Sequence, residues 1–200
     1  MRKPALVLFD LGNVLVRFTP ESFWQTLGLL EKTEKAPYRA GVKQAAKKFE
    51  RGKLKTSEFF DELDRIFAGR FRREHLRRAT ASVLTDPIPE MDKLVSRVTQ
   101  RTSTALVSNT NEFHYAYCMD TLPAMKMLPK HYLSYKLGVM KPKPEFYRKV
   151  LKEQKIKAET TVLIDDVDKN VEGAQAEGMC GILFKNAENL ETQLKELHIL

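Results

Sequence analysis

Four short apolar runs recur along the chain and indicate its architecture. None of them alternates with polar residues, which is the pattern of strands buried on both faces of a sheet. The runs lie at residues 6–9, 105–107, 161–164 and 181–184. Apolar residues at helical spacing separate them, at 91–98, 147–151 and, less clearly, 171–175. Strands that alternate with helices predict an α/β protein with a parallel sheet covered by helices on both faces.

The segment 17–85 has a different pattern, because it contains no strand-like run. Its Thr19-Pro20-Glu21 stretch is typical of a helix start, with a threonine cap, a proline and an acidic residue in the first turn. Helical spacing then occurs twice more, at Phe59, Phe60, Leu63, Ile66 and Phe67 and at Leu76, Ala79, Val83 and Leu84. We therefore predict an all-helical insertion of three or four helices after the first strand.

This pattern divides the chain into two predicted domains. Segments 1–16 and 86–200 form the core domain, and 17–85 forms the inserted helical domain. The Thr-Asp-Pro-Ile-Pro sequence at 85–89 suits a semi-rigid hinge between them. Charge follows the same division, since 17–85 contains 16 Lys/Arg and 9 Asp/Glu and carries +7 of the net charge of +8.

Composition is that of an ordinary globular protein, with 42% hydrophobic and 30% charged residues in 200. The only cysteines, Cys118 and Cys180, lack metal-ligand spacing and suit a reducing cytoplasm. The first apolar run resembles a signal peptide, but Asp10 and Gly12 interrupt it and no small-residue cleavage site follows. We expect an unprocessed cytoplasmic protein with no membrane partner.

Polar clusters follow three of the apolar runs. Asp10 comes after the first, Ser108-Asn109-Thr110-Asn111 after the second, and Asp165-Asp166 after the third. Ligands bind at the carboxyl ends of strands in an open parallel sheet, so these side chains are predicted to share one rim. Alone, Asp10 would be taken for a structural turn residue, and Asp165, Asp166 or Asp168 for a cap of the next helix.

Three carboxylates on one rim repel one another unless a cation joins them. Magnesium, which binds one or two carboxylates together with substrate phosphate, is the cation that fits. Lys141, in the sequence Gly-Val-Met-Lys-Pro, adds a fixed positive charge. Carboxylates, a metal, a hydroxyl and a lysine together suit phosphoryl transfer, which consists of positioning and charge neutralisation.

Four motifs, in order, resemble those of the haloacid dehalogenase superfamily of aspartate-nucleophile hydrolases. They are FDLGNVL at 9–15, VSNTN at 107–111, GVMKPKPEFY at 138–147 and IDDVDKNVEGA at 164–174. The chain is also similar to the subgroup of small bacterial sugar-phosphate phosphatases typified by α-D-glucose-1-phosphate phosphatase. The resemblance implies a Rossmann-like core, a helical cap domain at the insertion, and a magnesium-dependent phosphatase acting on a small phosphorylated metabolite such as a sugar phosphate.

The resemblance also implies a metal site. Asp10 would be the nucleophile that forms an aspartyl-phosphate, and one of its oxygens would bind Mg²⁺. The backbone carbonyl of Gly12 and the carboxylate of Asp166 would be the other protein ligands. Asp165 and Asn170 would hold the metal and its waters in place.

The same resemblance implies a phosphate site. Ser108, Asn109 and Lys141 would hold the transferring phosphoryl oxygens, and Lys141 would also screen Asp10 from the acids opposite. In the cap, Phe23, Trp24, Phe49, Glu50 and Arg51 are candidates for the face toward the substrate.

Gly12 departs from the superfamily pattern, because most of its phosphatases carry a second aspartate at this position. That aspartate protonates the leaving oxygen and later activates water, and general acid–base catalysis contributes about 10²–10⁴-fold. Glycine does occur in the subgroup named above. We expect a preference for good leaving groups and a longer-lived aspartyl-phosphate unless another residue substitutes. Asn13, Asn111 and His114 are near enough in sequence to position a water, and none is favoured.

Two alternative functions remain open at this point. A hydrolytic dehalogenase also lacks the second aspartate, but it works without a metal and has no use for the Asp165-Asp166 pair. A non-catalytic protein could instead dock an acidic partner through the basic insertion, whose cations include Lys43, Lys47, Lys48, Arg51, Arg70, Arg72, Arg73, Arg77 and Arg78. Nucleic-acid binding is not expected, because these cations are interspersed with acids and lack aromatic stacking platforms. The sequence leaves the oligomeric state open.

Overall fold

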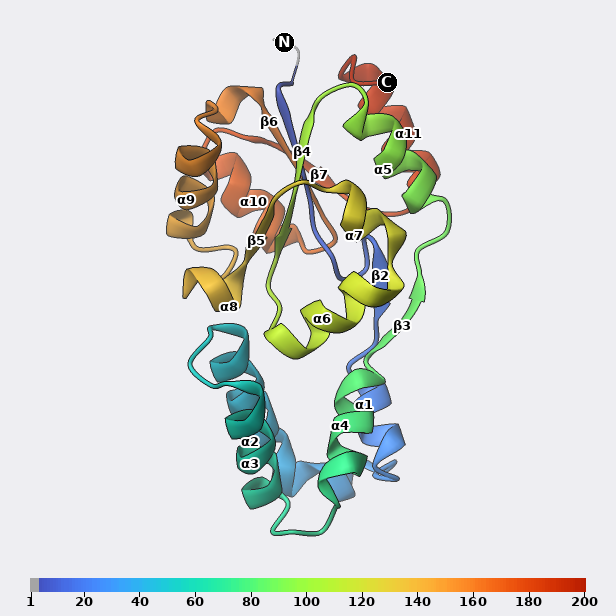
Figure 1. The fold of residues 1–200 in the computed structure, drawn as a ribbon, viewed down its shortest axis with the longest axis vertical. Coiled ribbons are helices and arrows are strands. Elements are labelled where there is room, and N and C mark those ends of the chain that lie inside the picture. The colour runs from blue at the N-terminus through green and yellow to red at the C-terminus, as the bar shows by residue number, and fades with distance from the viewer. Residues whose placement is uncertain (1–3) are drawn as a thin grey trace.

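The computed structural model describes residues 4–200, so the first three residues of the predicted core segment 1–16 lie outside the described residues. In this range five parallel strands form one sheet in the order β5-β4-β1-β6-β7 (Figure 1). The strands are β1 (Leu6–Phe9), β4 (Ser103–Ser108), β5 (His131–Leu133), β6 (Thr161–Asp165) and β7 (Cys180–Leu183). The predicted parallel α/β sheet is therefore confirmed, and all four apolar runs are strands.

Helices cover both faces of the sheet, because successive side chains of a strand point to opposite faces. Leu6 and Leu8 pack in one apolar cluster with Phe146, Tyr147 and Val150. These three belong to α9 (Pro144–Gln154), which lies beside α10 (Asp168–Ala176). The opposite face is covered by α5 (Met91–Thr99), α6 (Glu112–Thr121), α7 (Pro123–Met127) and α11 (Ala187–Glu196) (Figure 1).

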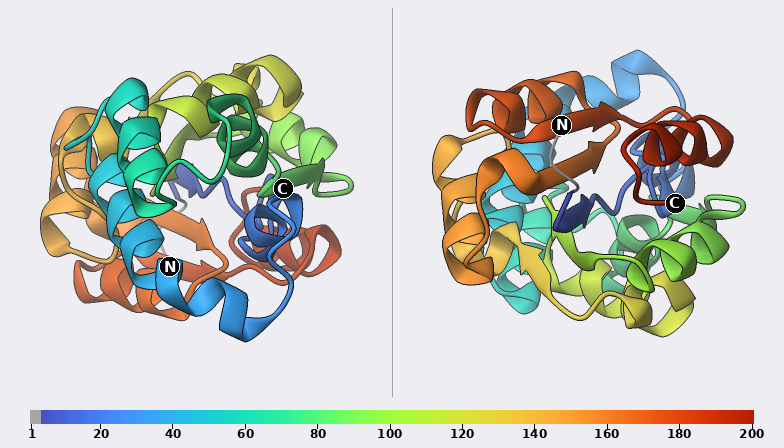
Figure 2. Two further views of the ribbon diagram at one scale, coloured as in Figure 1. Left: turned by 90° about the horizontal axis from the view of Figure 1, so that it is seen from below. Right: turned by 90° about the horizontal axis from the view of Figure 1, so that it is seen from above.

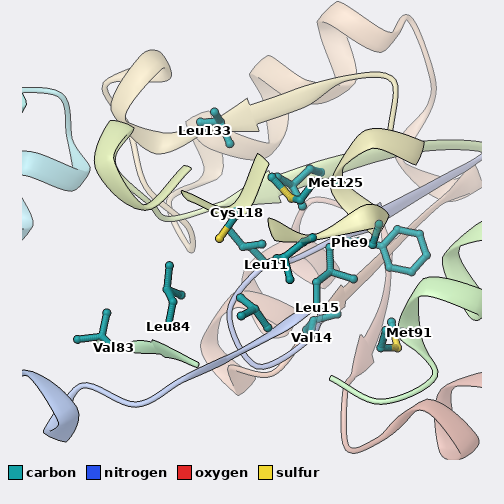
Figure 3. Packing of buried hydrophobic residues seen from close by; sticks show 14 of the residues in the cluster. Phe9, Leu11, Val14, Leu15, Val83, Leu84, Met91, Cys118, Met125 and Leu133 are labelled. Atoms are coloured by element: carbon teal, nitrogen blue, oxygen red, sulfur yellow. The ribbon is translucent and has the colours of Figure 1, made fainter. Parts of the chain in front are cut away.

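The second apolar cluster lies on that opposite face and extends into the inserted segment. Figure 3 shows Phe9, Met91 and Met125 together in it. The same cluster includes Val83 and Leu84 at the junction and Phe59, Leu63 and Leu76 within the insertion. Core and insertion therefore share one continuous apolar interior.

The insertion consists of helices that lie together at one end of the sheet (Figure 1). They are α1 (Glu21–Thr26), α2 (Lys32–Glu50), α3 (Thr56–Ile66) and α4 (Arg73–Ala81). Viewed from that end, α2 and α3 lie to one side, and strands of the sheet are visible beyond the helices (Figure 2, left). Four helices within 21–81 agree with the predicted three or four.

Two short strands were not predicted at the junction. β2 (Val16–Phe18) pairs antiparallel with β3 (Leu84–Pro87), so residues 85–87 of the segment expected to form a semi-rigid hinge lie in a two-stranded link. The strands are too short, and their Arg17, Thr85 and Asp86 too polar and exposed, to give a strand pattern. The expectation that 17–85 holds no strand is therefore wrong at both ends.

Other local expectations also need correction. α4 ends at Ala81, so Val83 and Leu84, placed on the helix by their spacing, lie beyond it. α1 begins after Pro20 with no side-chain cap, so Thr19 does not cap it. β5 was missed because its three residues, His-Tyr-Leu, are too few to form a pattern.

Three polar contacts join the insertion to the core. The Ser134 hydroxyl donates to the backbone carbonyl of Glu50 at 2.6 Å. Thr56, which begins α3, donates to the carboxylate of Glu112. His114 Nε2 lies 2.9 Å from the Thr80 carbonyl oxygen. Together they hold the insertion over the carboxyl ends of the strands. Among residues 4–200, no helix is long and apolar enough to cross a lipid bilayer.

Gly52→Ala is expected to destabilise the protein more than Gly69→Ala. Both glycines have left-handed φ angles, +66° and +71°, so alanine costs about 1 kcal/mol or more at each. A Cβ at Gly52 would lie 2.1 Å from the Tyr135 carbonyl oxygen of the core, whereas one at Gly69 would meet nothing within 4 Å. We expect Gly52→Ala to lower the free energy of unfolding by about 1–3 kcal/mol beyond the control in urea denaturation. Equal losses would contradict this close approach of insertion and core.

Candidate active site

The central position of β1 brings the predicted site residues together. β1 lies between β4 and β6, and the parallel register aligns their carboxyl ends. Asp10 directly follows β1, Ser108 ends β4 and Asp165 ends β6. The three side chains therefore lie on one rim, as the sequence predicted.

The Lys141 ammonium occupies the centre of this rim. Its Nζ donates to Asp10 Oδ1 at 2.8 Å, to Asp165 Oδ2 at 2.6 Å and to the Val107 carbonyl at 2.9 Å. Burial lowers the pKa of Lys141. The charges and hydrogen bonds of Asp10 and Asp165 raise it by more, so the pKa lies above its ordinary value. All three ammonium protons are engaged, so a phosphoryl oxygen would have to replace one of these acceptors.

The carboxylates are arranged so that a cation fits. One oxygen each of Asp10, Asp165 and Asp166 lies within 4.8 Å of the others. Burial is the main cause that raises the pKa of Asp10 to about 7 and also raises that of Asp166. A divalent cation would favour the ionised carboxylates and offset this cost. The donor set of oxygens is the one that Mg²⁺ prefers.

The hydrogen bonds distinguish the three carboxylates. Both oxygens of Asp165 are occupied, Oδ2 by Lys141 and Oδ1 by the Asn170 amide and the Val167 N–H. Asp10 and Asp166 each keep one oxygen without a side-chain partner among residues 4–200. Asp10 and Asp166, but not Asp165, therefore each keep an oxygen that a cation could use.

Asn109 lies at the predicted place but has a different contact. Its Oδ1 accepts from the Lys141 N–H and its Nδ2 donates to the Lys141 carbonyl, both at 2.9 Å. The side chain therefore positions the backbone of Lys141, and this contact uses one of the two N–H bonds of the amide. The Ser108 hydroxyl lines the cavity and has no hydrogen-bond partner within residues 4–200.

Asn13 has a role that the sequence did not reveal. Its Nδ2 donates to Asp166 Oδ2 at 2.9 Å, and its Oδ1 accepts from the Phe18 N–H. The residue has a positive φ of 53°, which asparagine tolerates better than most residues. Asp168 begins α10 but makes no side-chain cap, so its expected capping role is wrong.

The rim opens into a cavity of about 300 Å³. Its lining includes Asp10, Gly12, Ser108, Lys141 and Asp166, together with Glu50 at the end of α2. A smaller cavity of about 130 Å³ adjoins it and is mainly apolar. Phe18, Glu50 and His114 line both cavities.

Comparisons with known proteins indicate the family of this chain. The family model described as haloacid dehalogenase-like hydrolase matches residues 4–178. A curated relative, D-ribitol-5-phosphate phosphatase of Bacteroides thetaiotaomicron, is 25% identical over 177 residues, which are 82% of this chain and 84% of that protein.

Solved structures share the fold. A haloacid dehalogenase family enzyme from the same species, in complex with magnesium and inorganic phosphate, has a TM-score of 0.81 at 22% identity and covers 95% of this chain and 98% of that chain. L-2-haloacid dehalogenase of Xanthobacter autotrophicus has a TM-score of 0.65 at 14% identity, covering 98% of this chain and 84% of that chain.

Lys141→Met is expected to lower the free energy of unfolding by about 3–5 kcal/mol at pH 7, because it leaves Asp10 and Asp165 facing each other without a counter-charge. The matched control is Lys143→Met, which removes an exposed lysine two residues away and should change stability by about 0.5 kcal/mol or less. Urea denaturation without added metal measures both. If Lys141→Met lowers the free energy of unfolding no more than the control does, the ammonium does not have this central role.

Proposed function

The chain belongs to the haloacid dehalogenase-like hydrolase family, and we propose that it is a magnesium-dependent phosphatase that hydrolyses a small phosphorylated metabolite through an aspartyl-phosphate on Asp10. The observation that carries this proposal is the pairing of Asp10 with the buried Lys141, with the Asp166 carboxylate in the same cluster. The arrangement provides a nucleophilic carboxylate and a place for a cation on one rim of one cavity.

The metal would be held by the free oxygens of Asp10 and Asp166 and by the backbone carbonyl of Gly12. When bound, Mg²⁺ neutralises the negative charge that phosphate and carboxylates bring together. Asn13 orients Asp166 through its 2.9 Å bond, and Asn170 does the same for Asp165. These bonds hold the carboxylates at fixed positions before substrate arrives.

Asp10 would act on phosphorus directly. A bond forms between phosphorus and the Asp10 carboxylate oxygen that does not hold the metal, while the bond from phosphorus to the alcohol oxygen breaks, and the alcohol leaves with one proton. Water then adds to phosphorus, the bond to Asp10 breaks, and inorganic phosphate leaves. Lys141 stabilises the charge of Asp10 in each step, and the Ser108 hydroxyl is free to donate to a phosphoryl oxygen.

The substrate class follows from the cavity and the comparisons together. A cavity of about 300 Å³ suits a small molecule, and the insertion at 17–85 would serve as a cap that closes over it. The relationship to a D-ribitol-5-phosphate phosphatase supports phosphate-monoester hydrolysis, with a sugar phosphate or a similar metabolite as substrate.

Dehalogenation is the weaker alternative. The likeness to L-2-haloacid dehalogenase, at 14% identity, concerns the fold alone. Asp165 and Asp166 are both placed at the rim with dedicated hydrogen-bond partners, Asn170 and Asn13. A metal-independent dehalogenase would have no use for this pair.

Asp10→Asn should reduce the hydrolysis of 4-nitrophenyl phosphate by about 10⁴-fold or more, because an amide cannot attack phosphorus. The wild-type enzyme should require Mg²⁺ and lose activity in EDTA. Asp120→Asn, on the exposed side of α6, is the matched control and should retain activity. Turnover that persists in Asp10→Asn, or that is absent from the wild-type protein with Mg²⁺, would refute the proposal.

Rapid quenching in acid during turnover should trap a protein that carries one added phosphoryl group. Peptide mass spectrometry should locate that group on Asp10, because an acyl phosphate survives briefly in acid. The adduct should be absent from Asp10→Asn. A wild-type enzyme that turns over without any adduct would argue for direct attack of water on the substrate.

A further inference from the structure

The cavity lacks the usual acid at residue 12, although a side chain would fit there. A Cβ on Gly12 would lie 3.5 Å from the Cβ of Phe18, which is ordinary contact, and its φ is not in the left-handed region. The backbone therefore does not require glycine. A side chain at residue 12 would point toward Phe18, which lies where the polar and apolar cavities meet.

The candidates named from the sequence, Asn13, Asn111 and His114, do not replace that acid, because their polar atoms are already hydrogen-bonded. His114 Nε2–H donates to the Thr80 carbonyl, and its Nδ1 accepts from the Asn111 amide at 3.1 Å. Burial also lowers the pKa of His114, which keeps the ring neutral. Asn111 Oδ1 accepts from the His114 N–H, and Asn13 bonds Asp166 and the Phe18 N–H.

Glu50 is different from these residues. The residue lines both cavities, yet its carboxylate has no hydrogen bond or ion pair with any residue in 4–200. Its position is nevertheless fixed, because Ser134 binds its backbone carbonyl and Gly52 packs against the Tyr135 carbonyl. An unpaired carboxyl that is held at a catalytic cavity is a candidate for proton transfer.

We propose that Glu50 is the catalytic acid and base that takes the place of the missing aspartate at residue 12. This inference rests on the proposed phosphatase function. In the first step, Glu50 gives its proton to the alcohol oxygen as the bond from phosphorus to that oxygen breaks. In the second step, its carboxylate takes a proton from water as the water oxygen bonds to phosphorus and the bond to Asp10 breaks, which restores both carboxyl groups.

The surroundings of Glu50 favour this role. Phe18, Phe49 and Phe59 line the adjoining apolar cavity together with Glu50. Burial raises the pKa of Glu50 to about 7, with Lys47 and Arg51 opposing the shift. A glutamic acid in an apolar pocket is a known arrangement for a general acid at neutral pH.

The test compares two substrates of similar size that differ in their need for a proton. Nitrophenolate is a good leaving group as the anion. The benzyloxy group, in contrast, must be protonated to leave as benzyl alcohol. Glu50→Gln should lower kcat/KM for benzyl phosphate by about 10²–10⁴-fold and leave that for 4-nitrophenyl phosphate within about threefold. It should also release a burst of nitrophenolate equal to the enzyme, because the aspartyl-phosphate then hydrolyses slowly.

Two further variants sharpen the comparison. Glu74→Gln removes an exposed glutamate from the same insertion and should leave kcat/KM unchanged for both substrates. Gly12→Asp combined with Glu50→Gln should restore part of the benzyl phosphate activity, because it returns an acid to the cavity. A folded Glu50→Gln protein, checked by circular dichroism, makes the kinetic comparison valid.

The outcomes separate this inference from the proposed function. Wild-type protein that hydrolyses neither substrate with Mg²⁺ refutes the phosphatase itself. Wild-type protein that hydrolyses 4-nitrophenyl phosphate but not benzyl phosphate has no working acid, which overturns the role of Glu50 alone. The role of Glu50 is also overturned if Glu50→Gln lowers kcat/KM equally for both substrates, or lowers it for neither.

Discussion

The buried ammonium of Lys141 is the interaction on which the rest of the site depends. It bonds Asp10, Asp165 and the Val107 carbonyl at once, so it neutralises two carboxylates at the end of an apolar sheet. Burying an unpaired carboxylate costs several kcal/mol, and two facing each other would cost more. The charge of Asp10 is therefore tolerated at the end of a fully buried strand because the lysine is also buried there.

The neighbouring elements act mainly by holding that lysine and its partners in place. Asn109 fixes the Lys141 backbone through both atoms of its amide, and Asn13 orients Asp166. The parallel register of β1 with β4 and β6 brings these loops to one rim. A network whose members are mutually bonded is rigid before ligand arrives, which is what phosphoryl transfer requires of its catalytic groups.

The insertion completes the cavity rather than merely covering it. Its contacts with Ser134, Glu112 and His114 of the core, and the shared apolar cluster, place the end of α2 beside the rim. Glu50 thereby enters the cavity from a helix that is remote in sequence from every motif. The same docking contacts therefore position Glu50 relative to the rim.

The sequence by itself determined the parallel sheet, the insertion and the meeting of Asp10, Asp165 and Asp166, because buried strands and their carboxyl ends leave local patterns. The place of Lys141 beside Asp10 came from the family resemblance and not from such a pattern. The tertiary structure alone decided three things: the pairing of β2 with β3, the use of Asn109 and Asn13 to hold other site residues, and the absence of a partner for the Glu50 carboxylate among residues 4–200, although the sequence had named Glu50 a candidate for the face toward the substrate. Strands of three or four residues with exposed polar side chains carry too little pattern to predict. Which polar atoms are already bonded, and which carboxylate stays free at a cavity, depends on contacts between residues far apart in the chain, and a linear pattern contains no record of those contacts.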